Sequence, residues 1–162
     1  MSEALIFEVA GQSLALPLTN VREVLQPGIP LPMPRAPFGC LGLLDVRGER
    51  LPFLDLAVML GQTPRRTLED ILEELVHSQA LVLIQGKSVV ALLVDRVLEV
   101  GTILEEVAPN DASEVLGRAA MLVQGTAECP DRRALLLRAE GLVTPARLRV
   151  LMRGTQRAGL RP

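Results

Sequence analysis

The sequence predicts a mainly β fold in which short strands are accompanied by a few helices. Of its 162 residues, 49% are hydrophobic, and most apolar runs have the length of a strand and are separated by glycine-containing turns. Two parts of the chain repeat one apolar pattern, and only one stretch has a long, regular helical period. These three observations favour paired short strands over a helical bundle.

Composition and charge exclude several classes of function. A net charge of −2 and the absence of Trp and Tyr argue against nucleic-acid binding. No apolar run could span a bilayer, and Met1-Ser2-Glu3 lacks the basic start of a signal peptide, so we expect a cytoplasmic protein without direct membrane insertion. Cys40 and Cys129 are isolated thiols that we expect to be buried and reduced. His77 is the only histidine, and no metal or cofactor is expected.

The first part of the chain predicts a hairpin and a rigid connector. Residues 4–10 and 13–18 flank Gly11-Gln12 and fit two paired strands, with Pro17 at an edge or a strand end because it lacks an amide donor. Residues 19–25 fit either a helical turn or a short strand. Five prolines within residues 27–37 favour extended backbone. We interpret that segment as a connector rather than as a proline-rich recognition peptide.

Residues 42–56 form the stretch around which the pattern is organised. Two apolar strands flank a charged turn at Gly48 and lead into a short helix at residues 56–60. Asp55 stands at the N-cap position of that helix, and Gly61 stands where it should end. A polar link then leads to the next element.

Residues 67–78 give the clearest helical signal. Thr67-Leu-Glu-Asp70 resembles a capping box, in which the side chain and backbone of the first and last residues bond each other. Apolar residues follow at steps of three and four, which predicts one stripe facing inward. The stripe consists of Leu68, Ile71, Leu72, Leu75 and Val76.

The second half of the chain repeats the first. Residues 79–85 and 88–94 predict a hairpin around Gly86-Lys87. Residues 14–24 align without a gap on 90–100, and residues 120–125 with 133–139 echo the second hairpin of the first half, with a longer turn. Each half is too small to bury a core alone, so the two should share one interface. The expected subdomains are 14–78 with the C-terminal helix 145–153, and 79–144 with pairing from the N-terminal strand; residues 155–162 are expected to fray.

Enzymatic motifs are missing from the sequence. It contains no phosphate-binding glycine loop, HExxH motif or nucleophile elbow. Asp45 and Asp55 form a carboxylate pair, but we interpret Asp45 as a turn residue and Asp55 as a helix cap. Short strands with exposed edges on an apolar chain favour protein binding through strand addition or groove packing.

Three segments carry a resemblance to a known family. Residues 42–48, followed by Pro52, Asp55-Leu56 and Gly61, resemble a motif of the CheW-like family, and residues 89–100 and 21–24 resemble two further segments of it. The matches occur in the family's order and cover about residues 4–110. The resemblance implies two intertwined SH3-like five-stranded β-barrels. It also implies a non-catalytic adaptor that couples chemoreceptors to a CheA-type histidine kinase in membrane-associated arrays.

The resemblance further implies which residues bind partners. One barrel is expected to pair with the regulatory domain of the kinase, and the groove between the barrels to take the cytoplasmic tip of the receptor; other CheW-like proteins are further expected partners. Arg47 either braces its loop or contacts a partner directly. Because Asp45 stands where the motif has Asn, we expect a local ion pair between Asp45 and Arg47. The partner-binding candidates are Val21, Glu23, Val24, Gly42, Arg47, Gly48, Val97 and Glu99.

Two alternatives remain. The first is a diverged CheW-like adaptor that binds a partner other than a kinase, for example in pilus or gliding motility signalling, through helix 67–78. It is motivated by the length of that helix and by Arg138-Ala139, which stand where the motif's second Asp-Leu would fall. The second, from another class, is a small hydrolase that uses Asp45 and Asp55.

Overall fold

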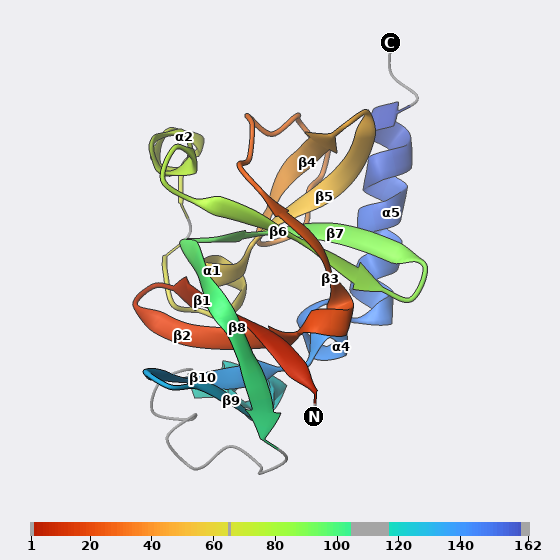
Figure 1. Ribbon diagram of the computed structural model, residues 1–162. Coiled ribbons are helices and arrows are strands. Elements are labelled where there is room, and N and C mark those ends of the chain that lie inside the picture. Colours follow the sequence, from red (N-terminus) through yellow and green to blue (C-terminus); the bar gives the residue numbers. More distant parts are fainter. Residues whose placement is uncertain (1, 65, 105–116, 160–162) are drawn as a thin grey trace.

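Ten strands form two five-stranded sheets in the computed structural model, which describes residues 2–64, 66–104 and 117–159 (Figure 1). This confirms the mainly β prediction with two five-stranded units. One sheet closes into a barrel, whereas the other stays open between its first and last strands. The barrel has the order β1 (Glu3–Val9), β2 (Gln12–Pro17), β10 (Arg132–Leu137), β9 (Val123–Cys129) and β8 (Arg96–Leu104). The open sheet has the order β3 (Val21–Leu25), β6 (Gln79–Gln85), β7 (Ser88–Val94), β5 (Glu49–Asp55) and β4 (Cys40–Val46).

The internal repeat reflects how the chain passes between the two sheets. The hairpin β1–β2 lies in the barrel and the next three strands lie in the open sheet; the hairpin β6–β7 lies in the open sheet and the last three strands return to the barrel. In each sheet one parallel pair joins the two halves, β2 with β10 and β5 with β7. Each half therefore gives a hairpin to one sheet and three strands to the other, so that the halves are intertwined.

Strand pairing divides the chain differently from the expected subdomains 14–78 and 79–144. β2 lies in the barrel, whereas β6 and β7 pair with β3 and β5 in the open sheet. The chain crosses between sheets after Pro17 and after Val94. The reason is that each repeated unit contains a hairpin in one sheet and then strands in the other sheet. The boundary between the two repeats is therefore not the boundary between the two sheets.

Hairpin turns follow local sequence chemistry. β1 and β2 are joined at Ala10-Gly11, β4 and β5 at Arg47-Gly48, and β6 and β7 at Gly86-Lys87. The predicted longer turn between β9 and β10 is wrong, because Cys129 pairs directly with Arg132 across a two-residue loop. Pro17 ends β2, where a missing donor is tolerated.

The stretch that was ambiguous in sequence contains both candidate structures. Leu18–Asn20 is a 3-10 helix, and β3 follows at once. The proline-rich segment after β3 contains no helix, turns at Pro34-Arg35, and pairs with β4 at one bridge, between Leu31 and Leu43. Gly42 makes this approach possible, because a Cβ there would lie 2.2 Å from the carbonyl oxygen of Leu31.

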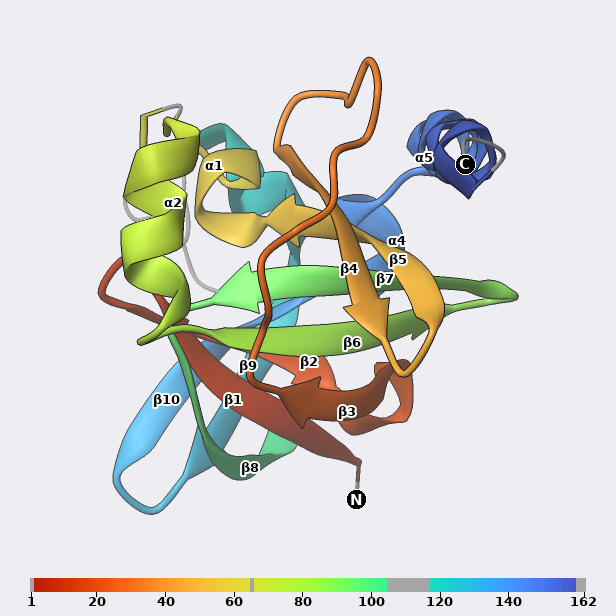
Figure 2. The ribbon, with the colours of Figure 1, turned by 90° about the horizontal axis from the view of Figure 1, so that it is seen from above.

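Helices cover the sheets at several points. They are α1 (Leu56–Met59), α2 (Leu68–Leu75), α4 (Ala139–Leu142) and α5 (Pro145–Gly159), and a second 3-10 helix spans Gly117–Leu122. In Figure 2, α2 and α5 lie on opposite flanks of the open sheet. No helix in the described part of the chain is both long and apolar enough to cross a membrane.

A helix is present where 67–78 was predicted, but it ends at Leu75, and its apolar stripe is less buried than expected. Thr67 and Asp70 form the predicted capping box, with Asp70 N donating to Thr67 Oγ1 over 3.2 Å. Only Ile71 and Leu75 of the apolar stripe are buried, where they pack inside the open sheet against Leu44 and Phe53. The other three members of the stripe, Leu68, Leu72 and Val76, are exposed.

α5 extends further than predicted. The sequence suggested an end near Gly154 and frayed residues beyond it, but the helix continues to Gly159; residues 160–162 lie outside the described residues. Gly154 is a packing position rather than a stop, because a Cβ there would lie 2.8 Å from the sulfur of Met33. Thr144 caps the start of the helix, where its Oγ1 accepts a bond from Arg147 N.

The main core lies between the two sheets, and each sheet has a smaller core inside it. Alternation along β1 shows the division, because Leu5, Phe7 and Val9 pack in the shared core whereas Ala4 and Ile6 face the barrel interior. The shared core also takes side chains from α1, α4 and α5. A shared interface between the halves, as expected from the repeat, therefore supplies most of the burial.

Candidate functional site

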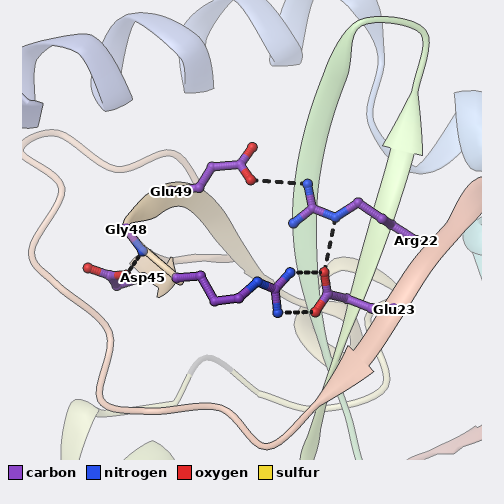
Figure 3. A network of polar contacts seen from close by, with 6 residues as sticks. Arg22, Glu23, Asp45, Gly48 and Glu49 are labelled. Carbon is purple, nitrogen blue, oxygen red and sulfur yellow. Dashed lines mark hydrogen bonds and ion pairs between the residues drawn. The ribbon is translucent and has the colours of Figure 1, made fainter.

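The candidate site lies where the two end strands of the open sheet, β3 and β4, approach without pairing (Figure 3). Charged side chains from β3 meet others from the turn between β4 and β5. We call this region the seam; its residues are Arg22, Glu23, Asp45, Arg47, Gly48 and Glu49.

A two-pronged ion pair crosses the seam. Arg47 donates from Nη1 to Glu23 Oε1 over 2.8 Å and from Nη2 to Glu23 Oε2 over 2.5 Å. The Arg47 side chain is 70% exposed and that of Glu23 is 23% exposed. The hydrogen bonds from Arg47 lower the pKa of Glu23 and raise that of Arg47, so both groups are charged at neutral pH.

A second arginine extends this network. Arg22 donates from Nε to Glu23 over 3.2 Å and from Nη1 to Glu49 over 3.1 Å. Two carboxylates from different strands, those of Glu23 and Glu49, are therefore bound by two guanidinium groups. Because a guanidinium group is planar, its hydrogen bonds fix the orientation of the carboxylates that it binds. Neither Arg22 nor Glu49 was among the candidates from the sequence, although Arg22 lies beside Glu23 in the same motif.

Asp45 stabilises the turn rather than pairing with Arg47, so the expected local ion pair is wrong. Its Oδ1 accepts a bond from Gly48 N over 2.8 Å. Arg47 and Gly48 have φ angles of 52° and 87°, the left-handed pair required in a tight two-residue hairpin. An aspartate three residues before that glycine suits the turn because its carboxylate accepts a bond from the backbone amide.

The equivalent edge of the barrel is closed in a different way. There β8 and β9 pair through their backbones, with Thr102 opposite Glu128. Glu99 is the repeat counterpart of Glu23, yet its neighbour is Cys129, whose pKa it raises through a side-chain hydrogen bond. Side-chain ion pairs therefore join the strands in the open sheet, whereas backbone bonds do so in the barrel.

The structure brings only some of the predicted partner-binding residues together. Glu23, Arg47 and Gly48 meet at the seam, whereas Val21 and Val24 lie on β3 half-buried against the shared core. Gly42 lies further along β4, at its bridge to the connector. Val97 and Glu99 lie on β8 in the barrel, where Val97 N donates to Gln79 Oε1 over 2.6 Å. Val97 is half-buried and Glu99 is exposed.

Asp55 occupies the predicted N-cap position of α1, but its side chain does not cap the helix. It is 1% exposed and makes no capping bond to α1. Its carboxylate instead accepts two bonds from Arg66, over 2.9 Å and 2.7 Å, and Arg66 also pairs with Glu74 of α2. This buried pair ties the end of β5 to the start of α2.

The two carboxylates proposed for a hydrolase lie too far apart to cooperate. Asp55 N bonds to Gly39 O, six residues before Asp45 on the extended strand, which corresponds to about 20 Å. Each carboxylate is also engaged separately, Asp45 in its turn and Asp55 with Arg66. The hydrolase alternative is therefore contradicted. Within the described residues, no cluster of three or more potential ligands could hold a metal ion.

Two hollows flank Arg66. The larger, of about 410 Å³, is lined by residues that include Ala10, from the turn between β1 and β2, Asp95, between β7 and β8, and Glu73 and His77, on and just after α2. The smaller, of about 210 Å³, is lined by residues that include Phe38 and Leu68. The groove between the barrels that the family resemblance implies remains a prediction.

Both cysteines are free and half-buried, so they are less enclosed than predicted. Burial raises the pKa of the Cys40 thiol, and the Glu99 carboxylate raises that of Cys129. Both thiols are therefore protonated at neutral pH and are weak nucleophiles.

Comparison with known families and curated proteins gives several matches. A family model described as a CheW-like domain matches residues 3–147. The "Probable chemotaxis protein CheW" of Rhizobium etli is 30% identical over 105 residues, 65% of this chain and 63% of that protein. "Protein FrzA" of Myxococcus xanthus is 41% identical over 64 residues, 40% of each chain. The "Chemotaxis protein CheW" of Rhizobium meliloti is 29% identical over 134 residues, 78% of this chain and 81% of that protein.

A solved structure also resembles the chain. The scaffolding protein TtCheW from Thermoanaerobacter tengcongensis superposes with a TM-score of 0.68 at 20% sequence identity, covering 90% of this chain and 94% of that one. At this identity the likeness supports the fold.

Proposed function

The chain belongs to the CheW-like domain family, and we propose that it is a scaffold that couples chemoreceptors to a CheA-type histidine kinase. Members of this family are non-catalytic scaffolds, in agreement with the prediction that the chain is not an enzyme. Its relatives from two Rhizobium species are named as chemotaxis proteins. In our proposal it works in the cytoplasm, at the receptor arrays.

The seam is the proposed contact for the kinase. The observation that carries this proposal is that two separate family motifs, at residues 21–24 and 42–48, meet in the Arg47–Glu23 ion pair. Arg47 is 70% exposed although both ends of its guanidinium are bound, so its outer edge is available to a second protein. The proposed contact for the receptor tip is the hollow of about 410 Å³ beside Arg66 and α2.

Exchanging the two charges of the seam tests the proposal. We expect Arg47→Glu to reduce co-purification with the kinase at least tenfold, because it removes the guanidinium and places two carboxylates together. The double variant Glu23→Arg, Arg47→Glu restores an ion pair across the seam with its direction reversed. Recovered binding in the double variant would mean that Arg47 braces the turn, and continued loss would mean that it contacts the partner.

Lys87→Glu is the matched control, because it reverses an exposed charge in the turn between β6 and β7. It should leave binding unchanged. If Arg47→Glu co-purified with kinase and receptor as well as the control does, the seam would not be the contact surface.

A second candidate function is an adaptor for a partner other than a kinase, bound through α2. The observation that favours it is the exposure of Leu68 and Val76, at 59% and 71%. Changing both to Ser leaves the buried residues Ile71 and Leu75 in place. Loss of a non-kinase partner from co-purified material, with kinase and receptor binding intact, would support this second function.

A further inference from the structure

α2 presents an apolar face that nothing in the described chain covers. Leu68, Leu72 and Val76 are spaced four residues apart and are 59%, 36% and 71% exposed. Residues at this spacing lie one above the other on a helix surface. Large exposed side chains gathered on one helix face are typical of a contact with another protein.

The same helix is strongly acidic. Four of its eight residues are Glu69, Asp70, Glu73 and Glu74, and none is basic. Asp70 closes the capping box and Glu74 pairs with Arg66. Glu69 and Glu73 are exposed and form no ion pair with another described residue. The apolar face is therefore bordered by negative charge that has no counterpart in the described part of the chain.

α5 has the opposite character. Its sequence contains four arginines and no acidic residue. Arg149 and Arg153 are exposed and form no ion pair within the described ranges, and Val150, between them, is 43% exposed. These three residues are spaced by one to four positions on the outer face of the helix, while Leu151 on the inner face is buried in the shared core.

The two helices cannot meet within one molecule, because they lie on opposite flanks of the open sheet (Figures 1 and 2). We propose that α5 of one copy docks along α2 of a second copy. Val150 then packs between Leu68 and Leu72, and Arg149 and Arg153 pair with Glu69 and Glu73. This contact uses two different surfaces, so it adds copies head to tail instead of closing a symmetric dimer.

The contact is small, since an eight-residue helix is only about 12 Å long. Interfaces of this size hold partners weakly and transiently, and ion pairs exposed at their rim weaken as salt is added. The proposed association therefore appears at high protein concentration and decreases with ionic strength. It goes beyond the proposed coupling function and does not depend on the seam.

Complementary charge reversals test the proposal by sedimentation velocity at increasing concentration. One variant carries Glu69→Arg and Glu73→Arg, which makes α2 basic like α5. The other carries Arg149→Glu and Arg153→Glu, which makes α5 acidic like α2. Each variant alone should sediment as a monomer where the unaltered chain self-associates. An equal mixture should associate again, because both kinds of contact between the two variants join opposite charges.

Circular dichroism checks that each variant is folded, and Lys87→Glu, a single reversal in the turn between β6 and β7 and outside both helices, should self-associate as the unaltered chain does. A chain that is monomeric at every concentration would overturn the proposal. So would self-association that survives either reversal, or a mixture that stays monomeric while both variants are folded; these outcomes would leave α2 as a surface for another protein.

Discussion

At the scale of single residues, Glu23 couples the seam to pH. Its pKa lies below the ordinary value of 4.5 because Arg47 hydrogen-bonds its ionised form, and the unfolded chain lacks that bond. The group therefore stabilises the fold above pH 4.5, and this stabilisation is lost as pH falls through the lowered pKa. We expect Glu23→Gln to be less stable than the unaltered chain at neutral pH, and the difference to shrink in acid.

Urea unfolding across the acid range measures this difference. Glu69→Gln is the control, since Glu69 forms no ion pair with any residue that the structure describes. A difference between Glu23→Gln and the unaltered chain that stayed constant from neutral pH into acid would show that the ion pair does not stabilise the fold.

Glycine is needed at position 42 because the backbone of Leu31 lies very close to it. Its φ of 127° strains any other residue, and a Cβ would lie 2.2 Å from Leu31 O. We expect Gly42→Ala to lower the free energy of unfolding by about 2 kcal/mol or more, because it adds strain and disrupts the bridge between Leu31 and Leu43. Gly48→Ala meets strain but no clash, and should cost about 1 kcal/mol. Equal costs in chemical denaturation would contradict this account.

The sequence predicted some residue roles and not others. The turn at Gly48 could be predicted because its chemistry is local: a positive-φ pair and an aspartate within three residues. The partner of Arg47 could not, because Glu23 is 24 residues away on a strand whose neighbour depends on the whole fold. Proximity in sequence suggested Asp45 as the partner instead. The Asp45 carboxylate, however, accepts a hydrogen bond from the backbone amide of Gly48 in the turn.

At the scale of elements, the pair of Asp55 and Arg66 fixes α2 to the end of β5. Both side chains are nearly buried, at 1% and 12% exposed. We expect Arg66→Met to destabilise the fold by about 3 kcal/mol, since it leaves a buried carboxylate without its partner. Adding Asp55→Asn to that variant removes the unpaired charge.

A double-mutant cycle in urea measures the coupling between these two residues. The double variant should lose less stability than the sum of the two single variants. Strictly additive losses would mean that the two side chains act independently, against the observed bonds of 2.9 Å and 2.7 Å.

Helices and strands with a local sequence signal could be predicted. Which face of such an element is buried was harder to predict. The capping box fixed the start of α2, but the sequence does not distinguish Ile71, which enters the open sheet, from Leu68, which does not. α5 was predicted too short because its Gly154 resembles a helix end. Only contact with Met33, more than a hundred residues away, explains why glycine is needed inside the helix.

At the scale of the whole molecule, the intertwined halves should be unable to fold alone. Residues 1–64 contain the hairpin of one sheet and three strands of the other, so each sheet is left incomplete. We expect the fragments 1–64 and 65–162 each to lack cooperative unfolding, and an equimolar mixture to recover it, as followed by circular dichroism. Cooperative unfolding of either fragment by itself would contradict the intertwined arrangement.

The sequence predicted the fold class, but it did not predict which strands belong to which sheet. The repeat showed that two similar halves share a core, but not which strands each sheet would receive. Sheet membership depends on the crossings after Pro17 and Val94, which bring together strands distant in sequence, such as β1 with β8. A local sequence pattern identifies a strand but does not show which strands pair with it.

The central claim is that this chain connects a receptor to a kinase, and recruitment of the kinase to receptor-containing membranes tests it most directly. Vesicles that carry the chemoreceptors of the same organism are sedimented with its CheA-type kinase, with and without the chain. We predict that the kinase sediments with the vesicles only when the chain is present, and that Arg47→Glu reduces its recovery. Equal sedimentation of the kinase with and without the chain would contradict the account.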